Sequence, residues 1–131
     1  MILPIIGYGA TVLKIKAKEI SVDYPELNKL ISDMYETMYD ASGVGLAAPQ
    51  IGKSIRLFVI DTSPFDNNDF EKNSGFEVKS VKKTFINPVM VDESGENGSF
   101  EEGCLSIPNI REHINRKSDI TIRYQDENLQ I

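Results

Sequence analysis

The sequence predicts an α+β fold in which a mostly antiparallel sheet packs around one helix. An apolar stripe with helical spacing lies near residue 30, and several later segments have the composition or the alternation of β-strands. With 131 residues the chain is short for two domains, since chains usually split only beyond roughly 150 to 250 residues. We therefore expect residues 1–131 to form a single domain.

The predicted helix covers about residues 25–40. Apolar side chains recur there at offsets of three and four, at Leu27, Leu30, Ile31, Met34 and Met38. Ser21 or Asp23 is expected to cap its start, with Pro25 in the first turn. Gly43 follows the last periodic residue, at a position where helices commonly end.

Three segments after the helix are predicted strands. Residues 55–61 and 84–92 are rich in β-formers, and residues 120–124 alternate apolar and polar side chains with a period of two. Pro88 favours an edge or a bulge in the second of these strands, because proline cannot donate a ladder hydrogen bond.

Two further segments have the character of connections. Residues 62–83 are polar and rich in Asn, Ser, Asp, Glu and Lys, which predicts a surface insertion between two strands. Asn97-Gly98 is a turn signal.

Composition limits the classes of function. The net charge is -6, from 14 Lys+Arg against 20 Asp+Glu, and an acidic chain is a poor match for a nucleic-acid backbone. One cysteine allows no internal disulfide, which fits a reducing, cytoplasmic setting. No window approaches the roughly 20 apolar residues of a membrane-spanning helix, so we expect no membrane interaction.

The segment Gly43 to Gln50 (GVGLAAPQ) is one of two that could carry chemistry. Two glycines two positions apart allow unusual backbone conformations and let another chain come close. The glycines alone also fit an ordinary, tightly packed connection between a helix and a strand.

The second such segment, Glu101 to Pro108, contains Cys104. A lone cysteine is often a small buried apolar residue. Neighbouring carboxylates disfavour a thiolate, whereas a bound metal cation stabilises one, so metal ligation is the more natural functional role. A nucleophile pair of Cys104 with His113, the only histidine, is conceivable, but the spacing does not favour it.

Together the two segments resemble the peptide deformylase family. GVGLAAPQ at 43–50 is similar to that family's G-x-G-L-A-A-x-Q signature, and EGCLS at 102–106 is similar to its E-G-C-x-S signature. The resemblance covers nearly the whole chain apart from residues 62–83.

The resemblance implies a metal-dependent hydrolase that removes the formyl group from the N-terminal formyl-methionine of nascent polypeptides. It makes Cys104 a metal ligand, Gln50 the amide that donates to the developing oxyanion, and Leu105 the residue whose backbone N–H assists it. It also implies a set of substrate-binding residues: Gly43, Val44, Gly45, Phe100 and Glu102. Apart from the resemblance, an inward Glu102 carboxylate needs a cationic partner, and we expect Arg116 in the first instance and Arg111 in the second.

The same resemblance implies the cofactor and the partners. The metal is Fe²⁺ in the first instance, with Zn²⁺ or Ni²⁺ as alternatives, held by a cysteine and the two histidines of an H-E-x-x-H helix. The partners are N-formyl-methionyl peptides, including nascent chains at the ribosome, in the cytoplasm.

The chain departs from the family because it contains no H-E-x-x-H motif. We therefore expect an incomplete domain that lacks the C-terminal motif helix, binds no metal tightly and is inactive, with a groove near Met34 and Met38 open to water. Two alternatives remain. One is a non-catalytic relic that binds formyl peptides, and the other is a cysteine hydrolase that uses Cys104 and His113.

Overall fold

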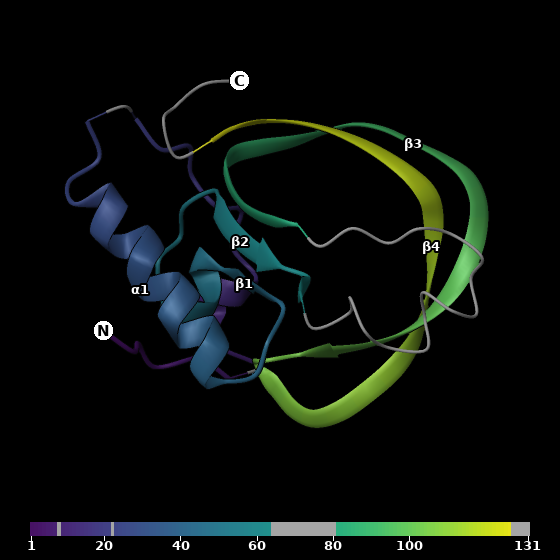
Figure 1. Cartoon of the computed structure of the whole chain (residues 1–131), viewed down its shortest axis with the longest axis horizontal. Helices are drawn as coiled ribbons and strands as arrows, with labels where there is room; N and C mark the ends of the chain where they lie inside the picture. The colour runs from purple at the N-terminus through teal and green to yellow at the C-terminus, as the bar shows by residue number, and fades with distance from the viewer. Residues whose placement is uncertain (8, 22, 64–80, 127–131) are drawn as a thin grey trace.

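The computed structural model describes residues 1–7, 9–21, 23–63 and 81–126, with the backbone alone at 96–103, 107–115 and 117–119. Its strands form one antiparallel sheet in the order β1-β2-β3-β4, with a single α-helix among the described residues (Figure 1). The elements are η1 (Thr11–Leu13), α1 (Leu27–Asp40), β1 (Gly45–Ala47), η2 (Ala48–Ile51), β2 (Leu57–Asp61), β3 (Lys82–Cys104) and β4 (Ile107–Gln125). The predicted α+β class is confirmed.

The core lies between α1 and the first strands of the sheet. The predicted stripe of α1 turns inward, and Ile31, Met34 and Met38 are buried. They pack with apolar side chains of the strands, which include Leu46, Leu57, Val59 and Ile86. A short amphipathic helix is stabilised mainly by packing its apolar face against another element in this way.

The ends of α1 differ from the predicted ones. Ser21 and Asp23 do not cap the helix, since the Ser21 hydroxyl donates to the Asp23 carboxylate at 2.6 Å, and Glu26 occupies the cap position with a left-handed backbone. At the other end Ser42 is left-handed (φ 57°), and Gly43 N–H donates to the Met38 carbonyl at 2.9 Å. This is a Schellman-type ending with a serine where glycine is usual.

The predicted strand segments lie in strands, and the proline disturbs one of them as expected. Of the predicted 55–61 the strand covers Leu57–Asp61, while 84–92 and 120–124 lie wholly in strands. The pairing of β3 with β4 shifts register between Ile86 and Val89, around Pro88. Asn87 there has φ 51° and takes part in bonds to three other segments. The strand is therefore bulged where the N–H of proline is missing.

The predicted turn at Asn97-Gly98 is wrong. Both residues lie within β3, opposite Lys117 and Arg116, next to a register shift between Ser94 and Asn97. The chain turns instead at Leu105 and Ser106, between Cys104 and Ile107. The long β3–β4 ladder on both sides outweighs the local preference of the dipeptide, which is accommodated beside a bulge. β3 and β4 together form a curved ribbon that extends away from α1 (Figure 1).

Most of the predicted insertion at 62–83 lies outside the described residues, and β3 already begins at Lys82. Its two ends meet. Thr62 N–H donates to the Val81 carbonyl at 2.9 Å, and Val81 N–H donates to the Thr62 hydroxyl at 2.8 Å.

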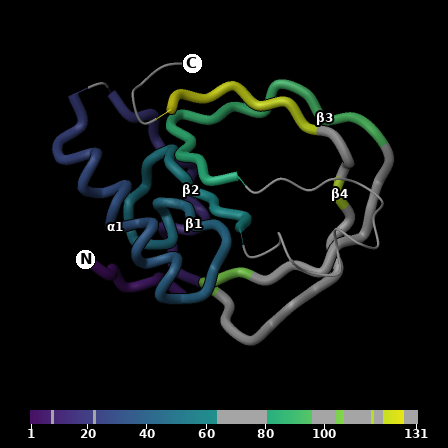
Figure 2. Tube along the Cα trace, viewed as in Figure 1, coloured from purple at the N-terminus to yellow at the C-terminus, as the bar shows by residue number. Residues whose placement is uncertain are grey.

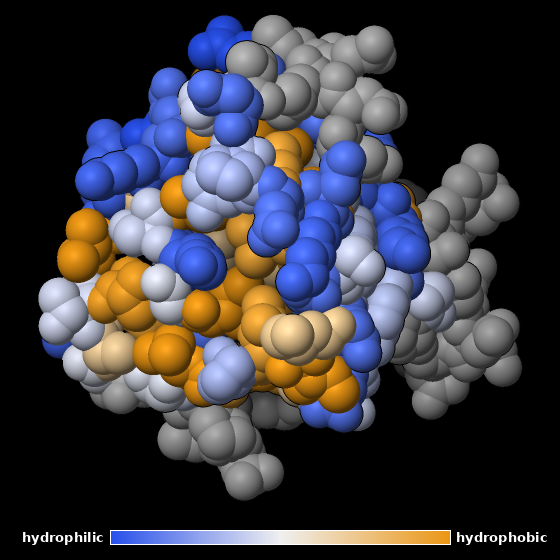
Figure 3. Space-filling view, turned by 90° about the vertical axis from the view of Figure 1, so that its left-hand side faces the viewer, coloured by the Kyte–Doolittle hydropathy of each residue, from blue (hydrophilic) through white to orange (hydrophobic). Residues whose placement is uncertain are grey.

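The expected open groove at Met34 and Met38 is not found. Both side chains are 0% exposed, because the β-strands and the partly buried residues around α1 enclose them. Exposed apolar side chains occur elsewhere, at Met90 and Ile120 on the β3–β4 ribbon and at the N-terminal segment. The face that carries α1 and this segment is apolar in its lower part (Figure 3). Among the described residues, no helix has the length and apolar character needed to cross a bilayer.

Candidate functional site

Two segments that are far apart in the sequence build the candidate site. The first runs from Gly43 through β1 into η2, which carries Gln50; Pro49 lies in the first turn of η2, and Gly52 ends it with φ 83°. The second is the β3–β4 turn, which carries Cys104, Leu105 and Ser106. The two segments lie side by side (Figure 2).

The Gln50 amide joins these segments. Its nitrogen Nε2 donates to the Ser106 hydroxyl at 3.2 Å and lies 3.5 Å from the Cys104 sulfur. Its oxygen Oε1 accepts the backbone N–H of Ala47 at 2.9 Å. The predicted proximity of Gln50 and Cys104 is therefore found, with the donor end of the amide directed at the thiol.

The three residues of the turn differ in their access to solvent. Cys104 is exposed, Leu105 is half-buried and Ser106 is only 5% exposed. The Cys104 thiol beside the Gln50 amide is therefore accessible to solvent, whereas the Ser106 hydroxyl that binds the same amide is buried.

Leu105 packs directly on Gly43. A Cβ atom at Gly43 would lie 2.7 Å from Leu105 Cδ1 and 3.2 Å from its Cγ, so the Leu105 side chain would have to shift to admit it. The absence of a side chain at the first glycine of the predicted motif therefore lets the Leu105 side chain pack directly on Gly43, two positions before β1 begins.

β1 is an edge strand among the described elements, because it pairs with β2 alone. The Val44 carbonyl accepts the Asp61 N–H at 2.9 Å, so Val44 bonds towards β2. In antiparallel pairing alternate residues bond to the same neighbour, so the N–H and C=O of Gly45 are directed at the opposite edge. An extended peptide can add to such an edge.

Three predicted residues, Phe100, Glu102 and His113, are placed by their backbone only. Phe100 and Glu102 lie in β3 opposite Ile114 and Glu112, and their side chains lie outside the description, so the expected Glu102–Arg116 pair does too. His113 lies opposite Glu101, three residues along β3 from Cys104, which is about 10 Å along a strand. This register does not place Cys104 and His113 at adjacent positions.

The described residues do not make a metal site by themselves. No three His, Cys, Asp or Glu side chains within the described part of the chain lie close enough to hold a metal ion. Cys104 is one soft ligand beside an amide and a hydroxyl, whereas a hydrolytic metal usually takes three protein ligands and a water. The described residues therefore do not fit a hydrolytic metal by themselves.

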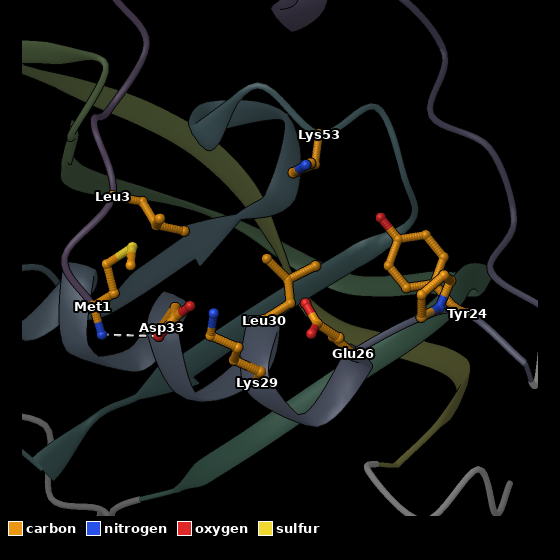
Figure 4. A pocket seen from close by; sticks show the side chains of 9 residues that line it. Met1, Leu3, Tyr24, Glu26, Lys29, Leu30, Asp33 and Lys53 are labelled. Carbon is orange, nitrogen blue, oxygen red and sulfur yellow. Dashed lines mark hydrogen bonds and ion pairs between the residues drawn. The ribbon is translucent and has the colours of Figure 1, made fainter.

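One pocket lies elsewhere, beside the N-terminus (Figure 4). Its volume is about 230 Å³, and Leu3, Tyr24, Leu30 and Lys53 are among its lining residues. The Met1 α-amine at its rim donates to Asp33 at 2.8 Å, and this bond raises the pKa of the amine. The lining includes none of the predicted site residues, so this pocket is separate from the Gln50–Cys104 pair.

Sequence reasoning missed the part played by Ser106. Its hydroxyl is buried and is bound to the residue that the first motif singles out, 56 positions earlier. The available signal was that Ser106 is the last residue of the E-G-C-x-S signature.

Comparisons with known proteins agree with this arrangement. The family model for polypeptide deformylase matches residues 2–131. The chain is 56% identical over 129 residues to a peptide deformylase of Flavobacterium psychrophilum and 54% identical over 129 residues to one of Christiangramia forsetii. Each match covers 98% of this chain and 66% of the relative, so the chain spans just under two thirds of their length.

Solved structures are similar as well. A peptide deformylase from Thermotoga maritima is 36% identical with a TM-score of 0.80, over 99% of this chain and 78% of that one. One from Synechococcus elongatus in complex with actinonin is 34% identical with a TM-score of 0.83, over 98% of this chain and 64% of that one.

Proposed function

Because the chain belongs to the polypeptide deformylase family, we propose that it carries the formyl-recognition part of a deformylase site. The substrate is the N-terminal formyl-methionine of nascent polypeptides, which the protein encounters at the ribosome in the cytoplasm. The supporting observation is the Gln50 amide, held by Ala47 with its nitrogen beside Cys104 and Ser106.

The proposed recognition begins at the backbone. An extended formyl-methionyl peptide adds to the free edge of β1 and hydrogen-bonds to the N–H and C=O of Gly45, with Gly43 and Val44 leading into the strand. We assign the methionine side chain to a pocket lined by Phe100, Glu102 and Val44. This docking directs the formyl carbonyl towards the Gln50 amide.

The chemical contribution of these residues is oxyanion stabilisation. Gln50 Nε2 and the backbone N–H of Leu105 flank Cys104 from the two segments, and both are donors suited to a carbonyl oxygen that becomes negative. Because Gln50 is held before substrate arrives, little reorganisation is needed when the charge develops.

Hydrolysis itself is not assigned to these 131 residues. The family's metal is Fe²⁺ in the first instance, with Zn²⁺ or Ni²⁺ accepted, and of its ligands the chain offers Cys104 but contains no H-E-x-x-H. We propose that the chain binds formyl-methionyl peptides, holds no metal tightly and does not turn substrate over.

Binding and activity of the 131-residue chain test this proposal. We expect formyl-Met-Ala-Ser to bind roughly three- to tenfold more tightly than Met-Ala-Ser, as one net hydrogen bond of about 1 kcal/mol implies. Gln50→Ala should abolish this preference, while Tyr24→Phe, far from the site in the sequence, should keep it. Equal binding of the two peptides by the unaltered chain would contradict the proposal.

Metal content and turnover distinguish the remaining possibilities. A fusion to the part of the Flavobacterium psychrophilum relative that the match does not cover should gain metal and deformylation, and Cys104→Ala should remove both. Stoichiometric metal with turnover in the unfused chain would show that the proposed division is wrong. Metal-free turnover that stops on thiol alkylation would identify a cysteine hydrolase instead.

A further inference from the structure

We propose that Ser106 is a positioning residue, whose hydroxyl determines which hydrogen of the Gln50 amide faces the reacting carbonyl. This inference rests on the proposed formyl recognition and adds a residue to it. It starts from an asymmetry at Gln50, where three neighbours hold one amide with different strengths.

Two of the three contacts fix the amide plane. The Ala47 N–H can only donate, so the atom of Gln50 that faces it at 2.9 Å must be the oxygen. The nitrogen then faces the Ser106 hydroxyl at 3.2 Å, and one of its two hydrogens is bound there. Rotation of the amide by half a turn would set two N–H donors against each other at Ala47.

The third contact is the weak one. The second hydrogen of Nε2 is directed at the Cys104 sulfur, 3.5 Å away, and sulfur is a poor hydrogen-bond acceptor. A carbonyl oxygen can replace this contact with a gain in strength. The amide hydrogen on the side of Ser106 is thus committed to the serine hydroxyl, and the one on the side of Cys104 is available to bind a substrate carbonyl.

Burial supports the same division. Ser106 is only 5% exposed, whereas Cys104 is exposed, so the committed hydrogen points inward and the available one points to the accessible side. The hydroxyl and the thiol also belong to one tight connection, since Cys104 pairs with Ile107 across it. Any movement of this turn therefore carries both partners of the amide together.

Three variants of the 131-residue chain test the role. Ser106→Ala removes the acceptor, Ser106→Thr keeps the hydroxyl, and Thr84→Ala removes another buried hydroxyl, which is bound to Tyr35 at 3.0 Å and does not contact Gln50. Two quantities are measured for each. The first is the ratio of the affinities for formyl-Met-Ala-Ser and Met-Ala-Ser, and the second is the pair of Gln50 side-chain amide signals in ¹⁵N–¹H spectra, assigned by their loss in Gln50→Glu.

We expect Ser106→Ala to lower the affinity ratio at least threefold, to leave the affinity for Met-Ala-Ser within twofold, and to shift the Gln50 amide signals and speed their exchange with water. Ser106→Thr and Thr84→Ala should keep the ratio and the signals. Unchanged Gln50 signals in folded Ser106→Ala would overturn the positioning role, whatever the peptides do.

The same data separate this inference from the proposed function. If Gln50→Ala abolishes the formyl preference and Ser106→Ala does not, formyl recognition stands and the role of Ser106 is wrong. If the unaltered chain has no formyl preference but its Gln50 signals depend on Ser106, the proposed function fails while the positioning of the amide stands. If Ser106→Ala does not fold, loss of the ratio in Ser106→Thr despite its hydroxyl would overturn the role.

Discussion

At the scale of single residues, Gly43 decides how closely the two site segments approach. The Leu105 side chain occupies the space in which a Cβ atom of residue 43 would lie. Gly45, two positions later, has no such neighbour, since the nearest atoms to its Cβ position are 3.7 Å away. Neither glycine has a positive φ, so steric contact distinguishes the two positions.

We therefore expect Gly43→Ala to destabilise the fold by about 1–3 kcal/mol, the usual cost of forcing an extra carbon into a packed contact. Gly45→Ala is the matched control and should change the free energy of unfolding by less than about 1 kcal/mol. Urea denaturation of the two variants measures the difference. Equal stabilities would mean that Leu105 moves aside freely.

At the scale of elements, the end of α1 is tied to the end of β2 by a hydrogen bond between side chains. The Tyr39 hydroxyl donates to the Asp61 carboxylate at 2.6 Å. This bond lowers the pKa of Asp61 and raises the pKa of Tyr39 to about 12. Both side chains have access to solvent, so we expect a modest contribution to stability.

The signs of the two shifts define a pH window. Asp61 has a lowered pKa in the fold, so its contribution is present above its unfolded value of about 3.9 and is lost as pH falls through the folded pKa. Tyr39 has a raised pKa, so its contribution is complete below its unfolded value of about 10 and is lost as pH rises through about 12. The bond stabilises the fold most between roughly pH 5 and 9.

Tyr39→Phe should accordingly lower stability at pH 7 and return the pKa of Asp61 towards its ordinary value. The stability difference from the unaltered chain should shrink as pH falls through the lowered pKa of Asp61. Carboxyl ¹³C titration of Asp61 and unfolding at several pH values measure both effects. Tyr35→Phe serves as the control, because the Tyr35 hydroxyl lies against Thr84 and should leave the titration of Asp61 in place.

At the scale of the whole molecule, the described residues enclose their own core. Met34 and Met38 are fully buried by the sheet and by the neighbours of α1. Met90, on the extended ribbon of β3 and β4, is 54% exposed. The same residue type thus occurs in opposite environments.

Met34→Ala should cost about 2–5 kcal/mol, as large-to-small changes in cores do. Met90→Ala should cost far less, because little of its side chain leaves water on folding. Thermal or urea unfolding of the two variants compares them. A small and equal effect at both positions would mean that Met34 faces solvent, as the sequence alone led us to expect.

Periodicity was enough to predict α1 and the strand segments, because burial of one face leaves its spacing in the sequence. It failed where partners are set by tertiary contacts. Asp23 is bound by Ser21 and does not cap the helix, and Asn97-Gly98 is held in a ladder. The proximity of Gln50 and Cys104 spans 54 positions, so only the family resemblance predicted it, and no local pattern predicted the bond to Ser106.

The paired hydrogen bonds between Thr62 and Val81 bear on which changes of chain length the fold tolerates. Because these two positions are hydrogen-bonded to each other, a change in the number of residues between them need not move β2 or β3. Closure entropy depends only weakly on the number of residues between two joined positions, at about 0.6 kcal/mol per doubling. Insertions and deletions between these two positions should therefore survive selection more readily than changes inside β2 or β3, and a reporter peptide spliced in there should leave the two strands in register.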